Sequence, residues 1–331
     1  MKKCMNHSDN FVDESLRGIY KAYPNFYREA NEDIRAVVHQ SKKERKVSIV
    51  TGGGYGHLPL FLGYVGDGLC DGVAVGNAFT SPSCETIQNI TNAVENKNGV
   101  LYLFGNYFGD GMNFDMAAEF AELEGIQTAI VKVSDDLASA PRENYTERRG
   151  IAGIVYAYKL VGACADSGAS LEEVKRIAEK VVANTATFGV AFSSCTLPGA
   201  DGPVFEISDE DMEIGMGIHG EPGVRRGKMM TSKELADELC PAVLKDLSIV
   251  EGDRISVLVN GLGNTSREEL FILYNDVFEI LKEKGITVVK ALVDEFATSF
   301  EMSGVSISIL KLDAETEPLL LEPAYTPFVN F

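Results

Sequence analysis

The first half of the chain alternates continuous apolar runs with a segment of helical periodicity. The apolar runs cover residues 47–50, 99–104 and 128–133, and uninterrupted runs of this length are typical of central strands covered on both faces. Between the last two runs, residues 113–123 carry apolar side chains at helical spacing and end at Gly125. A strand, a glycine-rich turn, a helix and another strand form a βαβ unit, which predicts a mainly parallel sheet.

Two further helices are predicted at the end of this half, at 150–166 and 171–184. The second opens with Ser170 and Glu173, which have the spacing of a helix capping box. We therefore expect an N-terminal α/β domain that contains the glycine-rich turns and covers residues 1–185.

The pattern of apolar and polar residues changes after about residue 186. It predicts short strands at 189–194, 204–207 and 212–218, and further strands at 254–260, 286–292 and 305–312. It also predicts two capped helices, which open at Thr231…Glu234 and Thr265…Glu268. Closely spaced strands followed by helices indicate an α+β arrangement. We expect a second domain over residues 186–331.

Composition narrows the class of protein. A chain of 331 residues with 45% hydrophobic and 24% charged residues has the length of two ordinary globular domains. The net charge of −19 repels phosphate backbones and anionic lipid, so we expect neither nucleic acid nor a membrane surface as a partner. The amino terminus lacks an apolar signal core and no apolar run is long enough to span a bilayer, which favours the cytoplasm. The six scattered cysteines form no C-x-x-C pair and indicate reduced thiols.

The first glycine-rich turn, residues 51–57, contains four glycines and ends at His57. Such a turn lets the backbone approach a small ligand closely and direct several N–H groups at it. The competing interpretation is a tight strand-to-helix turn with a surface histidine. The turn fits neither the dinucleotide-binding fingerprint nor a P-loop, and no P-loop occurs elsewhere in the chain, so nucleotide binding has no support here.

The second turn, residues 105–111, directly follows an apolar run and contains Asp110. A carboxylate at the carboxyl end of a parallel strand lies where α/β proteins bind ligands. Asp110 is equally compatible with the first turn of a helix, where the helix dipole favours a negative charge. The sequence leaves the two interpretations even.

The third turn, residues 215–223, places His219 among glycines. A neutral imidazole is a nucleophile near physiological pH, and flanking glycines leave its ring accessible. The alternative is a loop histidine that hydrogen-bonds a backbone carbonyl. A metal site built from His57, His219 and Asp110 is a weaker third possibility, because no pair of these residues is close in sequence.

In their order, these turns resemble the substrate-binding subunit of bacterial dihydroxyacetone kinases, the DAK1 type. The resemblance runs from Val47 to the carboxyl terminus, and its most specific string is Gly-Ile-His-Gly-Glu-Pro-Gly at 217–223. The other matching strings are 52–57, 79–82, 106–107, 109–110, 113–114, 148–150, 159–163, 212–213 and 259–263.

The resemblance implies roles for individual residues. It implies that His219 attacks the ketone carbonyl through Nε2 and holds the sugar as a hemiaminal. It implies that His57 and Asp110 move protons at the hydroxyl that is phosphorylated, with no metal on this chain. The substrate-binding residues it implies are Gly54, Tyr55, Gly56, His57, Ser81, Gly105 and Asp110.

The resemblance also implies partners. A phosphoenolpyruvate-dependent system of this kind holds ADP or ATP and magnesium on a separate nucleotide-binding subunit, so this chain would bind dihydroxyacetone and no cofactor. Single-chain enzymes append that nucleotide domain, and this chain is too short to include it. Members of the family are homodimers, and we expect one here.

Three positions depart from the family pattern: Tyr55 replaces a serine, Leu58 a glutamate and Gly105 a lysine. The first places an aromatic ring in the loop expected to hold the ketose, and the other two remove charges. They keep open two alternatives to a dihydroxyacetone kinase subunit. One is a non-catalytic ketose sensor that acts with a transcriptional regulator, and the other is a kinase subunit for a four-carbon ketose such as erythrulose.

Overall fold

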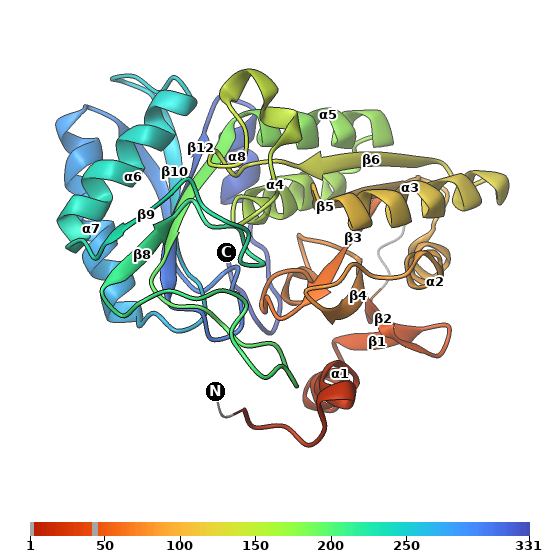
Figure 1. The fold of residues 1–331 in the computed structure, drawn as a ribbon. Coiled ribbons are helices and arrows are strands. Elements are labelled where there is room, and N and C mark those ends of the chain that lie inside the picture. The colour runs from red at the N-terminus through yellow and green to blue at the C-terminus, as the bar shows by residue number, and fades with distance from the viewer. Residues whose placement is uncertain (1–2, 42–45) are drawn as a thin grey trace.

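Two six-stranded sheets build the protein, and they lie beside each other (Figure 1). The structure is a computed structural model that describes residues 3–41 and 46–331. The first sheet has the strand order β1-β2-β4-β3-β5-β6. Its strands are β1 (Tyr27–Ala30), β2 (Asp33–His39), β3 (Ser48–Tyr55), β4 (Gly72–Ala78), β5 (Val100–Gly105) and β6 (Thr128–Val133).

Parallel pairing dominates the middle of this sheet. Strand β3 pairs in parallel with β4 and β5, and β5 pairs in parallel with β6. The antiparallel hairpin β1–β2 joins the other side of β4. The prediction of a mainly parallel α/β sheet is confirmed, and the carboxyl ends of β3 and β5 carry the first two glycine-rich turns.

Helices cover both faces of the first sheet. One face packs against α2 (Cys84–Val94) and α3 (Phe108–Leu123), and the other packs against α1 (Phe11–Ala22), α4 (Ile154–Asp166) and α5 (Leu171–Ala183). Helix α4 is buried along almost its whole length, which explains its near-continuous apolar sequence. Three short 3-10 helices, η1 (Ser8–Asn10), η2 (Leu62–Tyr64) and η3 (Arg142–Glu147), complete this half.

The second sheet has the order β11-β10-β12-β7-β8-β9, and among its pairings only β10 with β11 is parallel. One face is covered by α6 (Ser232–Asp246) and α7 (Arg267–Glu283), while α8 (Thr316–Leu321) packs against α4. The strands are β7 (Thr185–Ala191), β8 (Asp211–Ile214), β9 (Arg225–Lys228), β10 (Arg254–Gly261), β11 (Thr287–Asp294) and β12 (Gly304–Lys311). The predicted α+β character is confirmed.

Three local expectations are wrong. No strand forms at 204–207, where the backbone is irregular between β7 and β8. Helix α3 begins at Phe108 and not at 113. Helix α7 is capped one residue later than expected, by a reciprocal box between Ser266 and Glu269, because the Thr265 hydroxyl instead donates to the Gly304 carbonyl at 2.8 Å.

The two sheets meet through backbone contacts and a shared apolar core. The segment after β6 pairs with β7, since the amide of Thr187 donates to the Asp135 carbonyl at 2.8 Å and that of Leu137 donates to the Thr187 carbonyl at 3.1 Å. Side chains from both sheets, such as Leu101 of β5 and Leu258 of β10, belong to one buried cluster. Loops from both sheets can therefore be held rigidly against each other, and the site described next lies between them. Within the described residues, no helix is long and apolar enough to cross a membrane.

Candidate active site

His57 follows strand β3 and is buried at 1% exposure. Its Nδ1 lies 2.6 Å from the backbone carbonyl oxygen of Thr298, 241 residues away in sequence. A carbonyl oxygen can only accept, so Nδ1 carries the proton and Nε2 carries the free lone pair. Burial, together with the nearby His219, lowers the pKa of His57 to about 3, so the ring is neutral at physiological pH.

His219 lies in the loop between β8 and β9 and contacts the His57 ring, with 4.9 Å between the centroids. Its Nδ1 is 3.1 Å from Oε1 of Glu221, and Oε2 of the same carboxylate accepts from the His219 backbone N–H at 2.9 Å. This carboxylate favours the proton on Nδ1 and leaves the Nε2 lone pair available. The side chain is 23% exposed, so a small molecule can reach the ring.

Glu221 is ionised in this arrangement. Burial alone would raise the pKa of Glu221, but the hydrogen bonds with His219 more than offset this and hold it at about 2. Arg149 lies at the far side of the carboxylate, 4.0 Å from Oε2, and is itself paired with Asp136. Glu221 is thus a fixed negative charge that orients the His219 ring and stabilises positive charge on it.

Asp110 is in the first turn of α3 and only 6% exposed. Burial raises the pKa of its carboxyl to about 6, and this is only partly opposed by a hydrogen bond with Ser81 and by the nearby His219. Asp110 therefore lies in the first turn of a helix, as one interpretation expects, and it is also near His219. Its role at a ligand stays a prediction. The glycines that look like a turn in sequence lie inside the helix. At Gly109 a side chain would collide with Ser81, whose Oγ would lie 2.6 Å from the Cβ.

Unpaired buried polar atoms gather around His219. In the described part of the chain, six buried side-chain nitrogen or oxygen atoms have no hydrogen-bond partner, and three of them are His57 Nε2, Asp110 Oδ1 and the Tyr107 hydroxyl. The Tyr107 ring contacts that of His219, with centroids 4.8 Å apart. Buried polar groups are nearly always paired in folded proteins, so such a concentration indicates a place that a polar ligand fills.

Aromatic side chains under backbone strain frame the two histidines. Phe79 stacks on His57 with centroids 4.7 Å apart and an interplanar angle of 5°, and it also contacts His219. Phe61, Phe79 and Phe300 all have a positive φ, between 52° and 63°, which is costly for a bulky residue. Strain of this kind clusters at functional sites, where the surrounding packing maintains it.

The close approach of β3 to the Phe79 segment requires glycine at position 54. A Cβ at Gly54 would lie 2.7 Å from the backbone nitrogen of Thr80, so only glycine lets β3 approach the strained Phe79 segment so closely. Gly105 ends β5 against Gly150, whose Cβ would lie 2.7 Å from the Gly105 Cα. A side chain at 105 would start against the Tyr107 ring, at 3.4 Å.

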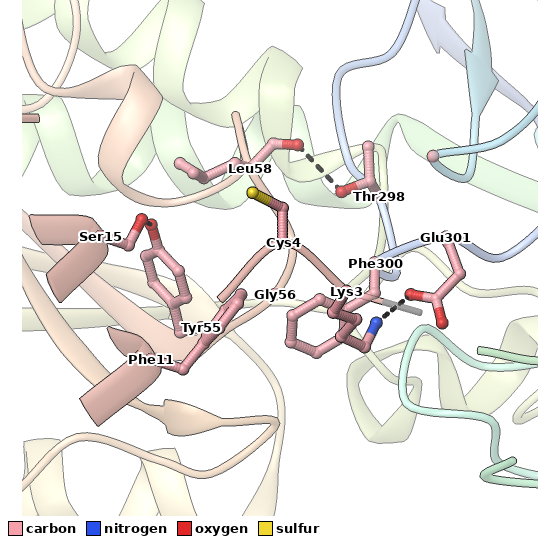
Figure 2. Close-up of a pocket in the computed structure, with 11 residues that line it drawn as sticks. Lys3, Cys4, Phe11, Ser15, Tyr55, Gly56, Leu58, Thr298, Phe300 and Glu301 are labelled. Atoms are coloured by element: carbon pink, nitrogen blue, oxygen red, sulfur yellow. Dashed lines mark hydrogen bonds and ion pairs between the residues drawn. The ribbon is translucent and has the colours of Figure 1, made fainter. Parts of the chain in front are cut away.

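Tyr55 and Leu58 line a small pocket together with His57. Both also line a neighbouring cavity of about 450 Å³, which includes neither His57 nor His219 (Figure 2). The Tyr55 hydroxyl is 2.5 Å from Oγ of Ser15 on α1, and the Tyr55 ring packs edge-on against Phe11. The Tyr55 hydroxyl is thus directed toward α1, and the place of Tyr55 among the substrate-binding residues stays a prediction.

The sequence missed several residues of the site. Thr298 and Phe300 come from the loop after β11, and nothing in their local sequence connects them with His57. Glu221 belongs to the Gly-Ile-His-Gly-Glu-Pro-Gly string at 217–223. Because it follows His219 by only two residues, the sequence already indicates a carboxylate near that ring. The proposed metal site receives no support, because no group of three or more His, Cys, Asp or Glu side chains within 3–41 and 46–331 could hold a metal ion.

Comparison with known proteins places these residues in a family context. Residues 17–328 match the model of the Dak1 domain. The chain is 43% identical over 329 residues to the dihydroxyacetone-binding subunit DhaK of a PTS-dependent dihydroxyacetone kinase from Listeria innocua, and 99% of each chain is covered. It is 41% identical to an L-erythrulose kinase from Pectobacterium atrosepticum, covering 99% of this chain and 56% of that protein. Among solved structures, a dihydroxyacetone kinase operon co-activator matches with a TM-score of 0.88 and 30% identity, over 96% of this chain and 97% of that one.

Proposed function

The chain belongs to the Dak1 domain family, and from this membership and the geometry around His219 we propose that it is the dihydroxyacetone-binding subunit of a dihydroxyacetone kinase. The activity is a phosphotransfer to an alcohol, in which a partner subunit supplies the phosphoryl group. The observation that carries the proposal is the set of three unpaired buried polar atoms around a reachable His219. They provide partners for the hydroxyl groups of a small ketose.

The first chemical step is capture of the ketone by His219. The Nε2 lone pair attacks the carbonyl carbon, the C=O π bond breaks, and the oxygen gains a proton while the imidazole loses the one on Nδ1. The product is a neutral hemiaminal, and no atom leaves. The ionised Glu221 beside Nδ1 stabilises the positive ring that exists before that proton departs.

The covalent bond also explains how so small a substrate is held. A three-carbon molecule offers few atoms for binding, and a bond to His219 supplies the orientation that non-covalent contacts cannot. Glycerol has no carbonyl and is therefore excluded.

Proton removal from the reacting hydroxyl falls to Asp110 rather than to His57. A base works best when its pKa is near the working pH, and the pKa of about 6 for Asp110 meets this condition better than about 3 for His57. The hydroxyl proton passes to Asp110 as the oxygen bonds the phosphorus atom and the donor's phosphorus–oxygen bond breaks. His57 Nε2 accepts a hydrogen bond and orients the substrate. Of the other substrate-binding residues, Ser81 holds Asp110, and Gly54, Gly56 and Gly105 shape the backbone around the ketose, while Tyr55 contributes its backbone alone.

The partner is a nucleotide-binding subunit that carries ADP or ATP and magnesium. The DhaK relative from Listeria innocua, matched over 99% of each chain, belongs to a PTS-dependent enzyme, which supports a phosphoenolpyruvate-driven system. We propose that the protein is a homodimer in the cytoplasm. We also propose that its two domains divide between residues 185 and 186.

The test is native mass spectrometry of the purified chain with dihydroxyacetone. The unmodified chain gains the mass of one ketose, and His219→Ala gains none. The variant His7→Ala, in an exposed segment, is the matched control and keeps the adduct. An adduct of equal occupancy in His219→Ala contradicts the proposal.

Two alternatives rest on particular relatives. The erythrulose kinase supports a four-carbon ketose as substrate, and the operon co-activator supports a sensor that does not turn over. Phosphorylation assays with the nucleotide-binding subunit and a panel of C3 and C4 ketoses separate all three. Preferred turnover of erythrulose favours the first alternative, and adduct formation without turnover of any ketose favours the sensor. The Tyr55 hydroxyl contacts Ser15 on α1 and not a histidine, so this departure gives the sensor little support.

A further inference from the structure

Helix α3 has a second apolar face that no part of the described structure covers. Side chains on this face are 43–85% exposed, and they recur every three or four residues, so they form one continuous ridge along the helix. The members of this α3 ridge are Phe108, Met112, Met116, Phe120 and Leu123. The opposite face of α3 buries Phe114 and Ala117 against the sheet. A contiguous exposed apolar surface of this kind marks an interaction site on a globular protein.

The ridge starts at the catalytic residues. Phe108 is the first residue of α3, directly after Tyr107, whose ring contacts His219, and Asp110 follows two positions later. At a rise of 1.5 Å per residue, the ridge then runs about 22 Å away from the site. Figure 1 shows α3 extending outward on the side of the first sheet that is remote from the second sheet. One continuous surface therefore joins the opening of the site to the outer face of the molecule.

We propose that the α3 ridge is the docking surface for the phosphoryl-donor subunit. This inference rests on the proposed function and specifies where its partner binds. In-line transfer needs the donor phosphorus within about 3–3.5 Å of the reacting hydroxyl, which lies beside Asp110. A protein–protein interface of ordinary size covers about 800 Å² on each partner, far more than the opening of a three-carbon site. A donor that covers Asp110 extends over Phe108 and onto the rest of the ridge.

Charge favours a partner of different composition over a second copy of this chain. Asp115, Glu119 and Glu122 are exposed beside the ridge, in a chain of net charge −19. A symmetric dimer through the ridge would bring these carboxylates of the two copies together. A donor subunit with an apolar strip flanked by basic residues fits both the ridge and its acidic borders.

The test measures docking separately from ketose capture. Met116→Glu places a charge in the middle of the ridge, six residues beyond Asp110, at a side chain that is 44% exposed. Phe271→Glu is the matched control, because Phe271 is 56% exposed on α7, which packs on the second sheet. The probe is the organism's own nucleotide-binding subunit, purified and loaded with ADP and Mg²⁺, and its binding is measured by biolayer interferometry.

Met116→Glu is expected to weaken docking at least tenfold, while Phe271→Glu leaves it unchanged. In turnover, Met116→Glu raises the concentration of donor subunit needed for half-maximal rate and keeps the rate at saturation. Both variants keep the ketose adduct in native mass spectrometry, which shows that the site is intact. Unchanged docking by Met116→Glu overturns the inference.

Three other results are equally decisive. Absence of docking by an unmodified chain that still forms the adduct overturns the inference and leaves the His219 proposal standing. Conversion of a dimer to a monomer by Met116→Glu, in light scattering, shows that a second copy occupies the ridge and also overturns it. An unmodified chain that forms no adduct removes the proposed function, and with it the premise of this inference.

Discussion

Two neighbouring regions of the molecule, the His219 site and the cavity lined by Tyr55, differ in how their polar groups are satisfied. Around His219, the buried atoms Nε2 of His57 and Oδ1 of Asp110 have no partner among the described residues. In the cavity, polar groups are paired with one another, as in Lys3 with Glu301 at 2.5 Å and Tyr55 with Ser15 at 2.5 Å (Figure 2). The cavity of about 450 Å³ therefore lies where the polar groups are already paired, and unpaired polar atoms are the better guide to function.

The two regions are physically connected. Phe300 lines the cavity and its ring contacts Phe79, with 5.2 Å between centroids, while Phe79 stacks on His57. Thr298 also lines the cavity, and its carbonyl holds His57 Nδ1. Substitutions in the His219 site and in the Tyr55 cavity therefore test whether only the first region affects the reaction.

The largest effect is expected from Asp110→Asn. The amide cannot accept a proton, so phosphoryl transfer falls by about 10²–10⁴-fold, the range typical of a lost general base. The ketose adduct persists, because His219 is untouched. Steady-state kinetics and native mass spectrometry measure the two effects separately. Asp237→Asn, at an exposed position of α6 on the second sheet, is the control, and an equal loss in that variant contradicts the role of Asp110.

Glu221→Gln is expected to weaken ketose capture by roughly five- to twelvefold. The substitution replaces a charged hydrogen bond to Nδ1, worth about 1.5–3 kcal/mol, with a neutral one worth about 0.5–1.5 kcal/mol. Titration with dihydroxyacetone, followed by native mass spectrometry, gives the change in affinity. Glu206→Gln, exposed in the preceding loop, is the control and keeps the original affinity. A Glu221→Gln variant with unaltered affinity would show that the carboxylate does not act on His219.

The pH dependence of transfer is expected to report Asp110. Since its pKa is raised to about 6, Asp110 is increasingly protonated below pH 6, and the rate falls there by about tenfold per unit. Above pH 6 the carboxylate is ionised and the rate is level with respect to this group. A rate profile at saturating ketose and donor measures the inflection. The residual activity of Asp110→Asn must lack it, and an inflection that survives assigns the titration to another group.

The smallest effect on the reaction is expected from Tyr55→Phe, in the neighbouring cavity. Loss of the hydrogen bond with Ser15 lowers the free energy of unfolding by about 0.5–1.5 kcal/mol. Ketose affinity and transfer change less than about threefold, because the hydroxyl faces α1 and not His57. Denaturant unfolding and adduct titration check the two quantities. A tenfold loss of ketose affinity in Tyr55→Phe would show that the cavity also contributes to ketose binding.

Much of the fold follows from local sequence. The apolar runs at 47–50, 99–104 and 128–133 correspond to β3, β5 and β6, because strands buried on both faces need continuous apolar residues. The failures have local causes as well. The run at 204–207 resembles a strand in composition, but its amides donate to loop atoms, Val204 to the Cys195 carbonyl and Phe205 to Ser194 Oγ, and no strand among the described residues pairs with it. The start of α3 was missed because Gly109 and Gly111 resemble a turn, whereas they permit close packing of the helix.

The sequence by itself determined which residues are chemically special: His57, Asp110 and His219, each in a glycine-rich segment after or between strands. Only the tertiary structure decided the surroundings and the protonation state of His57 and Asp110. It brings Thr298 across 241 residues to fix the tautomer of His57, and it buries Asp110 enough to raise its pKa. It also directs the Tyr55 hydroxyl toward α1. Tautomer, pKa and side-chain direction depend on neighbours that are distant in sequence, because burial and hydrogen bonding are properties of the folded surroundings and not of the residue.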